Sequence, residues 1–114
     1  MNAKVVHYSR IEAKEVAEKG ASKARIRVLI GVEDGAENFI MRMFELEPGG
    51  NTPLHKHPWE HEIFILEGEG LVKIGDREYN VSDGYVIYIP PNIEHTIINR
   101  GSRLLRFLCL IPKI

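Results

Sequence analysis

The chain has 114 residues, of which 44% are hydrophobic and 27% are charged, as expected for one soluble globular domain. Fifteen basic residues nearly balance 16 acidic ones, which excludes the basic surface typical of proteins that bind nucleic acids or membrane surfaces. Apolar runs such as 63–66 are far too short to cross a bilayer. A single cysteine, Cys109, excludes an internal disulfide, and the N-terminus has no apolar leader, so we expect a cytoplasmic protein.

The first 37 residues contain one helical pattern and one strand pattern. Ser9-Arg10-Ile11-Glu12 has the form of a capping box, which predicts a helix over 13–19 that ends at Gly20. A run rich in β-branched and apolar residues then predicts a strand at 24–30. We expect residues 1–37 to form an N-terminal arm and the first strand.

From residue 38 onward, short apolar runs alternate with turn residues, which predicts an all-β domain. The expected strands are 38–46, 53–57, 61–67, 71–75, 78–81, 85–89, 94–99 and 103–111. Short strands at this spacing are typical of a β-sandwich or barrel. No repeat or linker divides the chain, so we expect residues 1–114 to form a single domain with its barrel over 38–111.

Several expected strands are apolar on both faces. In 61–67, Ile63 and Ile65 fall on one face, while Phe64 and Leu66 fall on the other. A small barrel buries only its inner face, so the outer apolar face needs another cover. The N-terminal segment or a second subunit would provide it, and we expect a homodimer.

Four of the five histidines form a regular pattern. His55 and His57 share one face of a strand, and His61 keeps the same parity four residues later. His95 lies on a later strand, and the fold has to bring it back to the others. Imidazole binds most first-row transition metals, so the pattern predicts a metal site, the alternative being histidines without a shared role. His7 has no such companions.

The histidines lie in two motifs that resemble those of the cupin family. The first, G-x5-H-x-H-x3,4-E-x6-G, is matched by Gly49, His55, His57, His61 and Gly68, with His61 where the family usually has glutamate. The second, G-x5-P-x-G-x2-H-x3-N, is matched by Gly84, Pro90, Asn92, His95 and Asn99, with Asn92 in place of glycine. Fifteen residues separate the motifs. The resemblance covers about 38–111 and implies a cupin double-stranded β-helix, or jelly-roll barrel, with a short N-terminal arm.

The resemblance also implies one divalent transition metal, with Mn or Fe favoured and Zn, Ni or Cu as alternatives. Glu62 is an alternative carboxylate ligand, but it has the wrong strand parity and breaks the interval to Gly68. Four neutral ligands would leave the full charge on the ion and favour an anionic or enolate-like co-ligand. The expected metal ligands are His55, His57, His61 and His95.

Other side chains are candidates for the barrel interior. The histidine parity predicts a lining of Ile63, Ile65 and Ile97. Arg42 interrupts an apolar run and points either inward, toward a substrate anion, or outward. Cys109 is either ordinary core or a neighbour of the metal, and Glu60 is a further candidate as a general base. Trp59 packs over the cavity mouth or contacts a second subunit.

Three functions fit these features. The resemblance implies a Mn- or Fe-dependent dioxygenase, an oxidoreductase acting on a small oxygen-containing substrate. The alternatives are a small-molecule binding module without chemistry and a metal-dependent isomerase or hydrolase of a small carbonyl compound. Nothing in the sequence indicates an organic cofactor, a nucleic-acid partner or a membrane partner.

Overall fold

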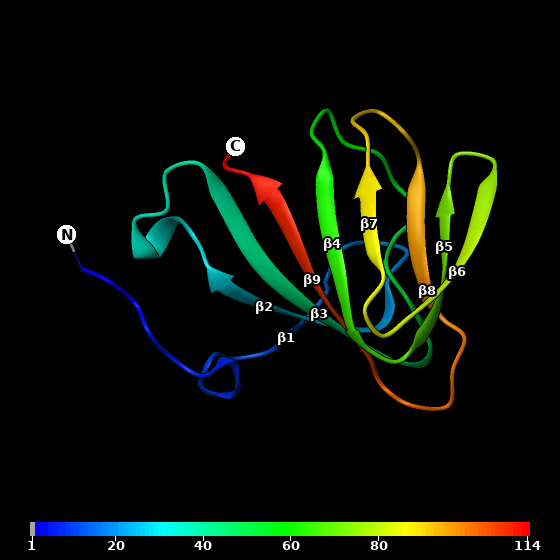
Figure 1. Cartoon of the computed structure of the whole chain (residues 1–114), viewed down its shortest axis with the longest axis horizontal. Helices are drawn as coiled ribbons and strands as arrows, with labels where there is room; N and C mark the ends of the chain where they lie inside the picture. Colours follow the sequence, from blue (N-terminus) through cyan, green and yellow to red (C-terminus); the bar gives the residue numbers. More distant parts are fainter. Residues whose placement is uncertain (1) are drawn as a thin grey trace.

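A computed structural model describes residues 2–114 of the chain (Figure 1). The strands are β1 (Lys14–Glu15), β2 (Ser22–Ile30), β3 (Phe39–Asn51), β4 (His61–Glu67), β5 (Glu69–Ile74), β6 (Arg77–Ser82), β7 (Val86–Ile89), β8 (His95–Asn99) and β9 (Leu105–Pro112). Two short 3-10 turns, η1 (Tyr8–Arg10) and η2 (Val32–Asp34), precede β1 and β3. The all-β fold predicted from the sequence is confirmed.

All strand pairs are antiparallel, and the sheet curls until its two halves face each other (Figure 1). The strand order is β6-β5-β8-β3-β9-β4-β7, with β2 added to β3 and β1 to β2. Along β4 the burial alternates, so that every second side chain points into the barrel. His61 at the start of β4 and His95 at the start of β8 therefore both point into the interior of the barrel.

The barrel is filled from both halves of the sheet. Phe44 of β3 and Phe107 of β9 stack with ring centroids 5.3 Å apart. Around them the most deeply buried side chains are Leu46, Ile65, Val72, Ile89 and Leu105. This packed core supports the part of the barrel where the histidines lie, and Phe44, Ile89 and Phe107 border the same cavity as the histidines.

The predicted helix over 13–19 is wrong. Lys14 and Glu15 form β1, which pairs antiparallel with Ile26 and Arg25 of β2. A seven-residue helix is marginal in water unless an apolar face packs against the core, and the segment offers only Ala13 and Val16 as half-buried apolar side chains. Pairing with β2 instead provides hydrogen-bond partners for the backbone of this segment.

The predicted strand over 53–57 is also wrong. Only His55 pairs there, in an isolated bridge to His95. Pro53 begins the segment and Pro58 follows it, and neither has a backbone N–H to offer a sheet ladder. The stretch is therefore a connection between β3 and β4 that carries two of the histidines.

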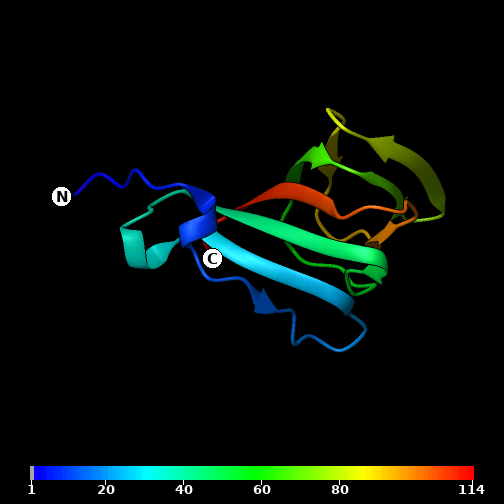
Figure 2. The ribbon, with the colours of Figure 1, turned by 90° about the horizontal axis from the view of Figure 1, so that it is seen from below.

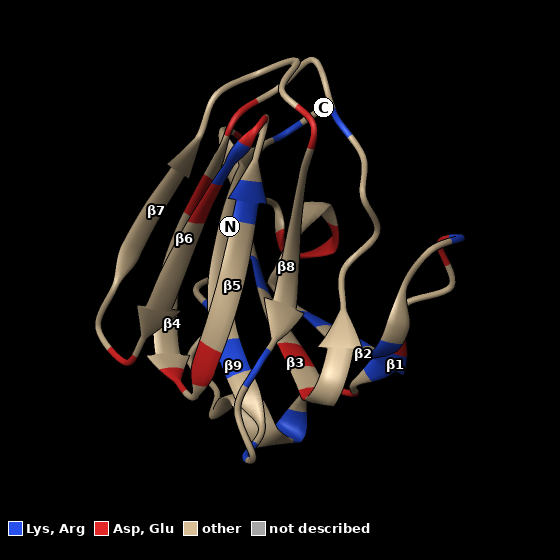
Figure 3. Cartoon of the chain, turned by 90° about the vertical axis from the view of Figure 1, so that its right-hand side faces the viewer, with Lys and Arg blue, Asp and Glu red and all other residues tan. Residues whose placement is uncertain are grey.

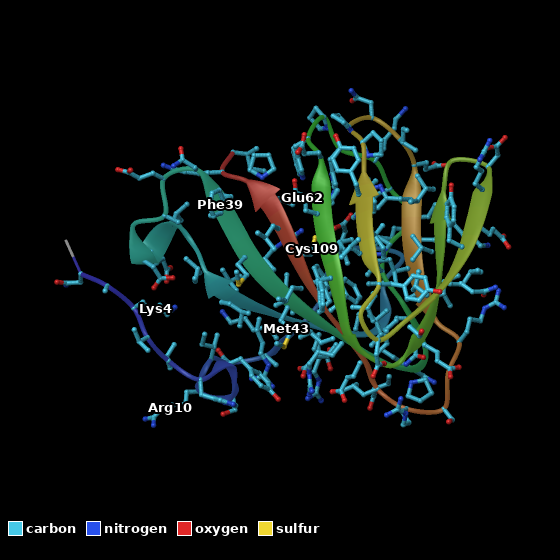
Figure 4. All side chains as sticks on the ribbon, viewed as in Figure 1. Lys4, Arg10, Phe39, Met43, Glu62 and Cys109 are labelled. Carbon is cyan, nitrogen blue, oxygen red and sulfur yellow. The ribbon has the colours of Figure 1, made fainter. Side chains whose placement is uncertain are left out.

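The outer face of the sheet keeps the apolar residues predicted to need a cover. Phe64, Leu66 and Val86 are exposed, and Val86 retains 74% of its accessible surface. The N-terminal arm runs away from this face, as Figure 2 and the position of Lys4 in Figure 4 show. Lys4 contacts the other end of the molecule through an ion pair with Asp34. A homodimer that covers the face stays a prediction.

Basic and acidic residues are interspersed along the strands and loops of the ribbon in Figure 3, in keeping with the near-zero net charge. Within residues 2–114, no helix is long and apolar enough to cross a membrane.

Candidate metal centre

Backbone pairing brings the two histidine motifs together. His55 and His95 exchange both of their backbone hydrogen bonds, at 3.2 and 2.9 Å. The Asn92 N–H donates to the carbonyl oxygen of His57 at 2.6 Å. Asn92 has a φ of 64°, in the left-handed region that asparagine tolerates better than most residues, which accounts for its presence at a glycine position of the motif. The loop before β8 is thereby fixed against the loop before β4.

Three of the predicted ligands converge closely. Ring nitrogen atoms of His55, His57 and His95 all lie within 4.8 Å of one another. The Nε2 atoms of His55 and His57 are 3.3 Å apart, close to the roughly 3 Å between two nitrogen ligands that share one ion at about 2.0–2.1 Å. His61 lies beside this group, its ring centroid 4.8 Å from that of His95 and 5.3 Å from that of His57.

The outward-facing nitrogen atoms of these rings have partners that determine which nitrogen carries the proton. His55 Nδ1 donates to the Glu18 carboxylate at 2.6 Å, and His95 Nδ1 donates to the Ile93 carbonyl at 2.9 Å. His61 Nδ1 lies 3.4 Å from the sulfur atom of Cys109. Because a carboxylate and a carbonyl only accept hydrogen bonds, the Nε2 lone pairs of His55 and His95 are left free, as metal coordination requires.

Sequence reasoning missed Glu18. This residue follows β1, 37 positions before the histidine that it contacts. Its partner is identifiable only once the 16–21 connection has been placed beside the barrel mouth, so no spacing rule would have found it. A carboxylate behind a histidine ligand orients the ring and makes it a better electron donor.

Burial keeps three of the rings neutral. Burial, reinforced by the neighbouring rings and the Arg42 guanidinium, lowers the pKa of His61 from 6.5 to about 3. Burial also lowers the pKa of His57 and of His95. These three imidazoles are therefore unprotonated at neutral pH, the form that binds metal.

The rings border a cavity of about 400 Å³ inside the barrel. Ile63 and Ile97 line it, as predicted. Ile65 also points into the barrel, as predicted, but its side chain is fully buried in the core and does not line the cavity. Trp59 lies at the cavity and stacks on the His57 ring with centroids 4.4 Å apart and planes 3° from parallel.

The charged and reactive candidates divide between the cavity and the outside. Arg42 and Cys109 both line the cavity, and Arg42 Nη2 donates to the Cys109 sulfur at 3.1 Å. Cys109 belongs to β9 and lies opposite Ile63 of β4 (Figure 4), and burial raises the pKa of its thiol. Glu60 lies outside and accepts a hydrogen bond from the Tyr88 hydroxyl, while Glu62 is exposed on the outer face.

Three buried side-chain nitrogen atoms within residues 2–114 have no hydrogen-bond partner, namely Arg42 Nε, Trp59 Nε1 and His61 Nε2. All three residues line this one cavity. Buried polar atoms in proteins are almost always paired, so a water molecule, a metal ion or a ligand in the cavity is the expected partner of these three atoms.

Comparison with known proteins agrees with the histidine motifs. Residues 42–111 match the family model described as "Cupin domain". The chain belongs to the cupin family. This cupin is 38% identical to a polyketide cyclase of Streptomyces resistomycificus, whose structure superimposes with a TM-score of 0.91 over 97% of this chain and 80% of that chain.

The chain matches different shares of two curated relatives. An oxalate-binding protein of Thermotoga maritima is 30% identical over 111 residues, which are 94% of this cupin and 92% of the relative. An uncharacterized protein of Methanocaldococcus jannaschii is 45% identical over 62 residues, 54% of this cupin and 50% of the relative. The match therefore spans half the length of the latter protein.

Proposed function

We propose that this cupin is a metal-dependent enzyme that acts on a small carbonyl compound bound in the barrel. His55, His57, His61 and His95 would hold one divalent transition metal. The observation that carries the proposal is the arrangement of the rings: three converge within 4.8 Å, and the fourth presents a buried Nε2 without a partner.

The donor set fits such an ion. Glu18 and Ile93 accept from the Nδ1 atoms of two rings, so the Nε2 lone pairs of these rings point away from their partners. A metal held only by neutral nitrogen atoms would supply Lewis acidity to a carbonyl or enolate oxygen. Mn and Fe are the favoured ions, with Zn, Ni and Cu as alternatives, because imidazole accepts all of them.

Carbonyl chemistry is supported by the 38% identity to a polyketide cyclase over nearly the whole chain. The cavity walls also favour it, since Phe44, Phe107, Ile63 and Ile97 exclude water from a bound substrate. Arg42 contributes a permanent positive charge that stabilises an oxyanion. The experiment below also tests for the dioxygenase activity that the family resemblance implies.

A binding function without turnover is the second candidate. It is favoured by the oxalate-binding relative, which this cupin matches over 92% of the relative's length. A binding module would show saturable affinity for a chelating ligand and no product.

The experiment begins with elemental analysis of protein purified without a histidine tag or added metal. We expect a near-stoichiometric first-row transition metal, or stoichiometric uptake when the metal-free protein is titrated with Mn²⁺, Fe²⁺, Zn²⁺, Ni²⁺ or Cu²⁺. The loaded protein is then assayed anaerobically with 2-oxo acids and 1,3-diketones, and in air with an oxygen electrode. Turnover without oxygen uptake supports carbonyl chemistry, and uptake that tracks metal loading supports a dioxygenase. Failure to bind any metal would refute the proposal.

A further inference from the structure

The cavity carries two hydrogen-bond donors that the metal site does not use. Arg42 Nε and Trp59 Nε1 are buried and lack partners, and neither atom is able to accept a hydrogen bond or bind a cation. Burying such donors without acceptors is costly, so their natural complement is a ligand with acceptor oxygens.

We propose that the barrel binds a chelating organic oxyanion with an apolar body, a carboxylate or enolate whose charged end is held by Arg42 and Trp59. This inference rests on the proposed function, because the same ligand would chelate the metal. It deepens that function by naming the substrate class.

The position of Arg42 supports an anion. Its Nη2 donates to the sulfur atom of Cys109, which lies 3.4 Å from His61 Nδ1, so the guanidinium lies on the histidine side of the cavity. Its carbon Cζ lies 5.1 Å from the centre of the Phe44 ring. Among residues 2–114, no carboxylate lies within 4.0 Å of this guanidinium. Glu18 also lines the cavity, but its carboxylate is bonded to His55.

The rest of the cavity supports an apolar body. Its walls include Ile26, Phe44, Ile63, Ile97, Phe107 and Ile111. The volume of about 400 Å³ falls in the range of roughly 300–1,000 Å³ typical of sites for small organic molecules. A two-carbon dianion would leave most of these apolar side chains without a partner.

Trp59 is the single tryptophan of the chain, so its fluorescence reports binding at this cavity whether or not metal is present. The probes are 4-methyl-2-oxopentanoate, its methyl ester and pyruvate. The ester removes the charge and keeps the body, whereas pyruvate keeps the charged head and removes the body. Each is titrated into metal-free and Mn²⁺-loaded protein, with calorimetry as a second readout.

The test variant is Arg42→Met, which keeps the aliphatic stem, and the matched control is Arg77→Met at the exposed start of β6. For the wild type and the control we expect the acid to bind about 10- to 100-fold more tightly than its ester, the worth of a charge-assisted hydrogen bond. In Arg42→Met the ratio of the affinity for the acid to the affinity for the ester should fall toward one. Arg42→Lys, which keeps the charge but loses the planar donor, should give an intermediate ratio and replaces the first variant if that one does not fold.

An acid-to-ester ratio unchanged by Arg42→Met would overturn the assignment of the anion to Arg42. Pyruvate binding as tightly as 4-methyl-2-oxopentanoate would overturn the apolar body. Mn²⁺ affinity is measured in parallel and should not fall in Arg42→Met, because the variant removes a positive charge beside His61 and removes no metal ligand. If no metal binds, the proposed function fails, and the ratio in metal-free protein still decides the role of Arg42.

Discussion

Acid should destabilise the metal-free protein through His61 in particular. The folded state holds the pKa of this imidazole near 3, against an ordinary value of 6.5. Between these two values the unfolded chain binds the proton and the folded chain does not, so stability falls as the pH falls. Lowering the pH from 7.5 to 4.0 should cost about 3 kcal/mol at this one site. That is a large part of the roughly 5–15 kcal/mol typical of a small domain.

The assay is urea unfolding of wild type and His61→Phe, each at pH 7.5 and pH 4.0 with a chelator present. Phenylalanine keeps a planar ring and removes the titrating group, so its own loss of stability between the two pH values should be smaller by about 3 kcal/mol. His7→Phe is the control, because His7 is exposed on the N-terminal arm and should lose as much as the wild type. If His61→Phe and wild type lose the same amount, the burial argument for His61 is wrong.

Three further predictions test other parts of the structure. His57→Ala should lower metal affinity at least 10-fold by removing a ligand, whereas His7→Ala should leave it unchanged; calorimetry with Mn²⁺ measures both, and equal affinities would contradict the site. Cys109 should react with a disulfide reagent far more slowly in the folded protein than in urea, because it is buried and its thiol pKa is raised; release of the coloured thiol gives the rate, and fast reaction of the folded protein would contradict the structure. Gly68→Ala should cost more stability than Gly84→Ala in urea unfolding. Both glycines have positive φ, but an added Cβ meets the Leu104 carbonyl oxygen at 2.6 Å only at Gly68; equal losses would contradict this packing.

The motif intervals were sufficient to predict that the histidines lie together, although His55 and His57 lie in a connection and not on a strand. The same reasoning failed at the edges of the barrel. A local capping signal at 9–12 precedes residues 13–19, yet pairing with β2 outweighs it. The 53–57 segment has strand-like parity, yet its prolines leave His55 as the paired residue of the segment. In both places the outcome depends on which neighbour offers backbone partners, and local sequence does not carry that information.

The sequence by itself determined the all-β class, the cupin resemblance and the four histidines, because each depends on residue types at fixed short intervals. Only the tertiary structure decided which charged and polar side chains share the cavity with them. The sequence leaves Arg42 on either face of its strand and Cys109 either in the core or near the metal. The register between β3 and β9 places the two side by side, pointing inward. Glu18 enters through a contact across 37 residues. Contacts between residues so far apart in sequence depend on strand register and loop placement, which are properties of the whole sheet.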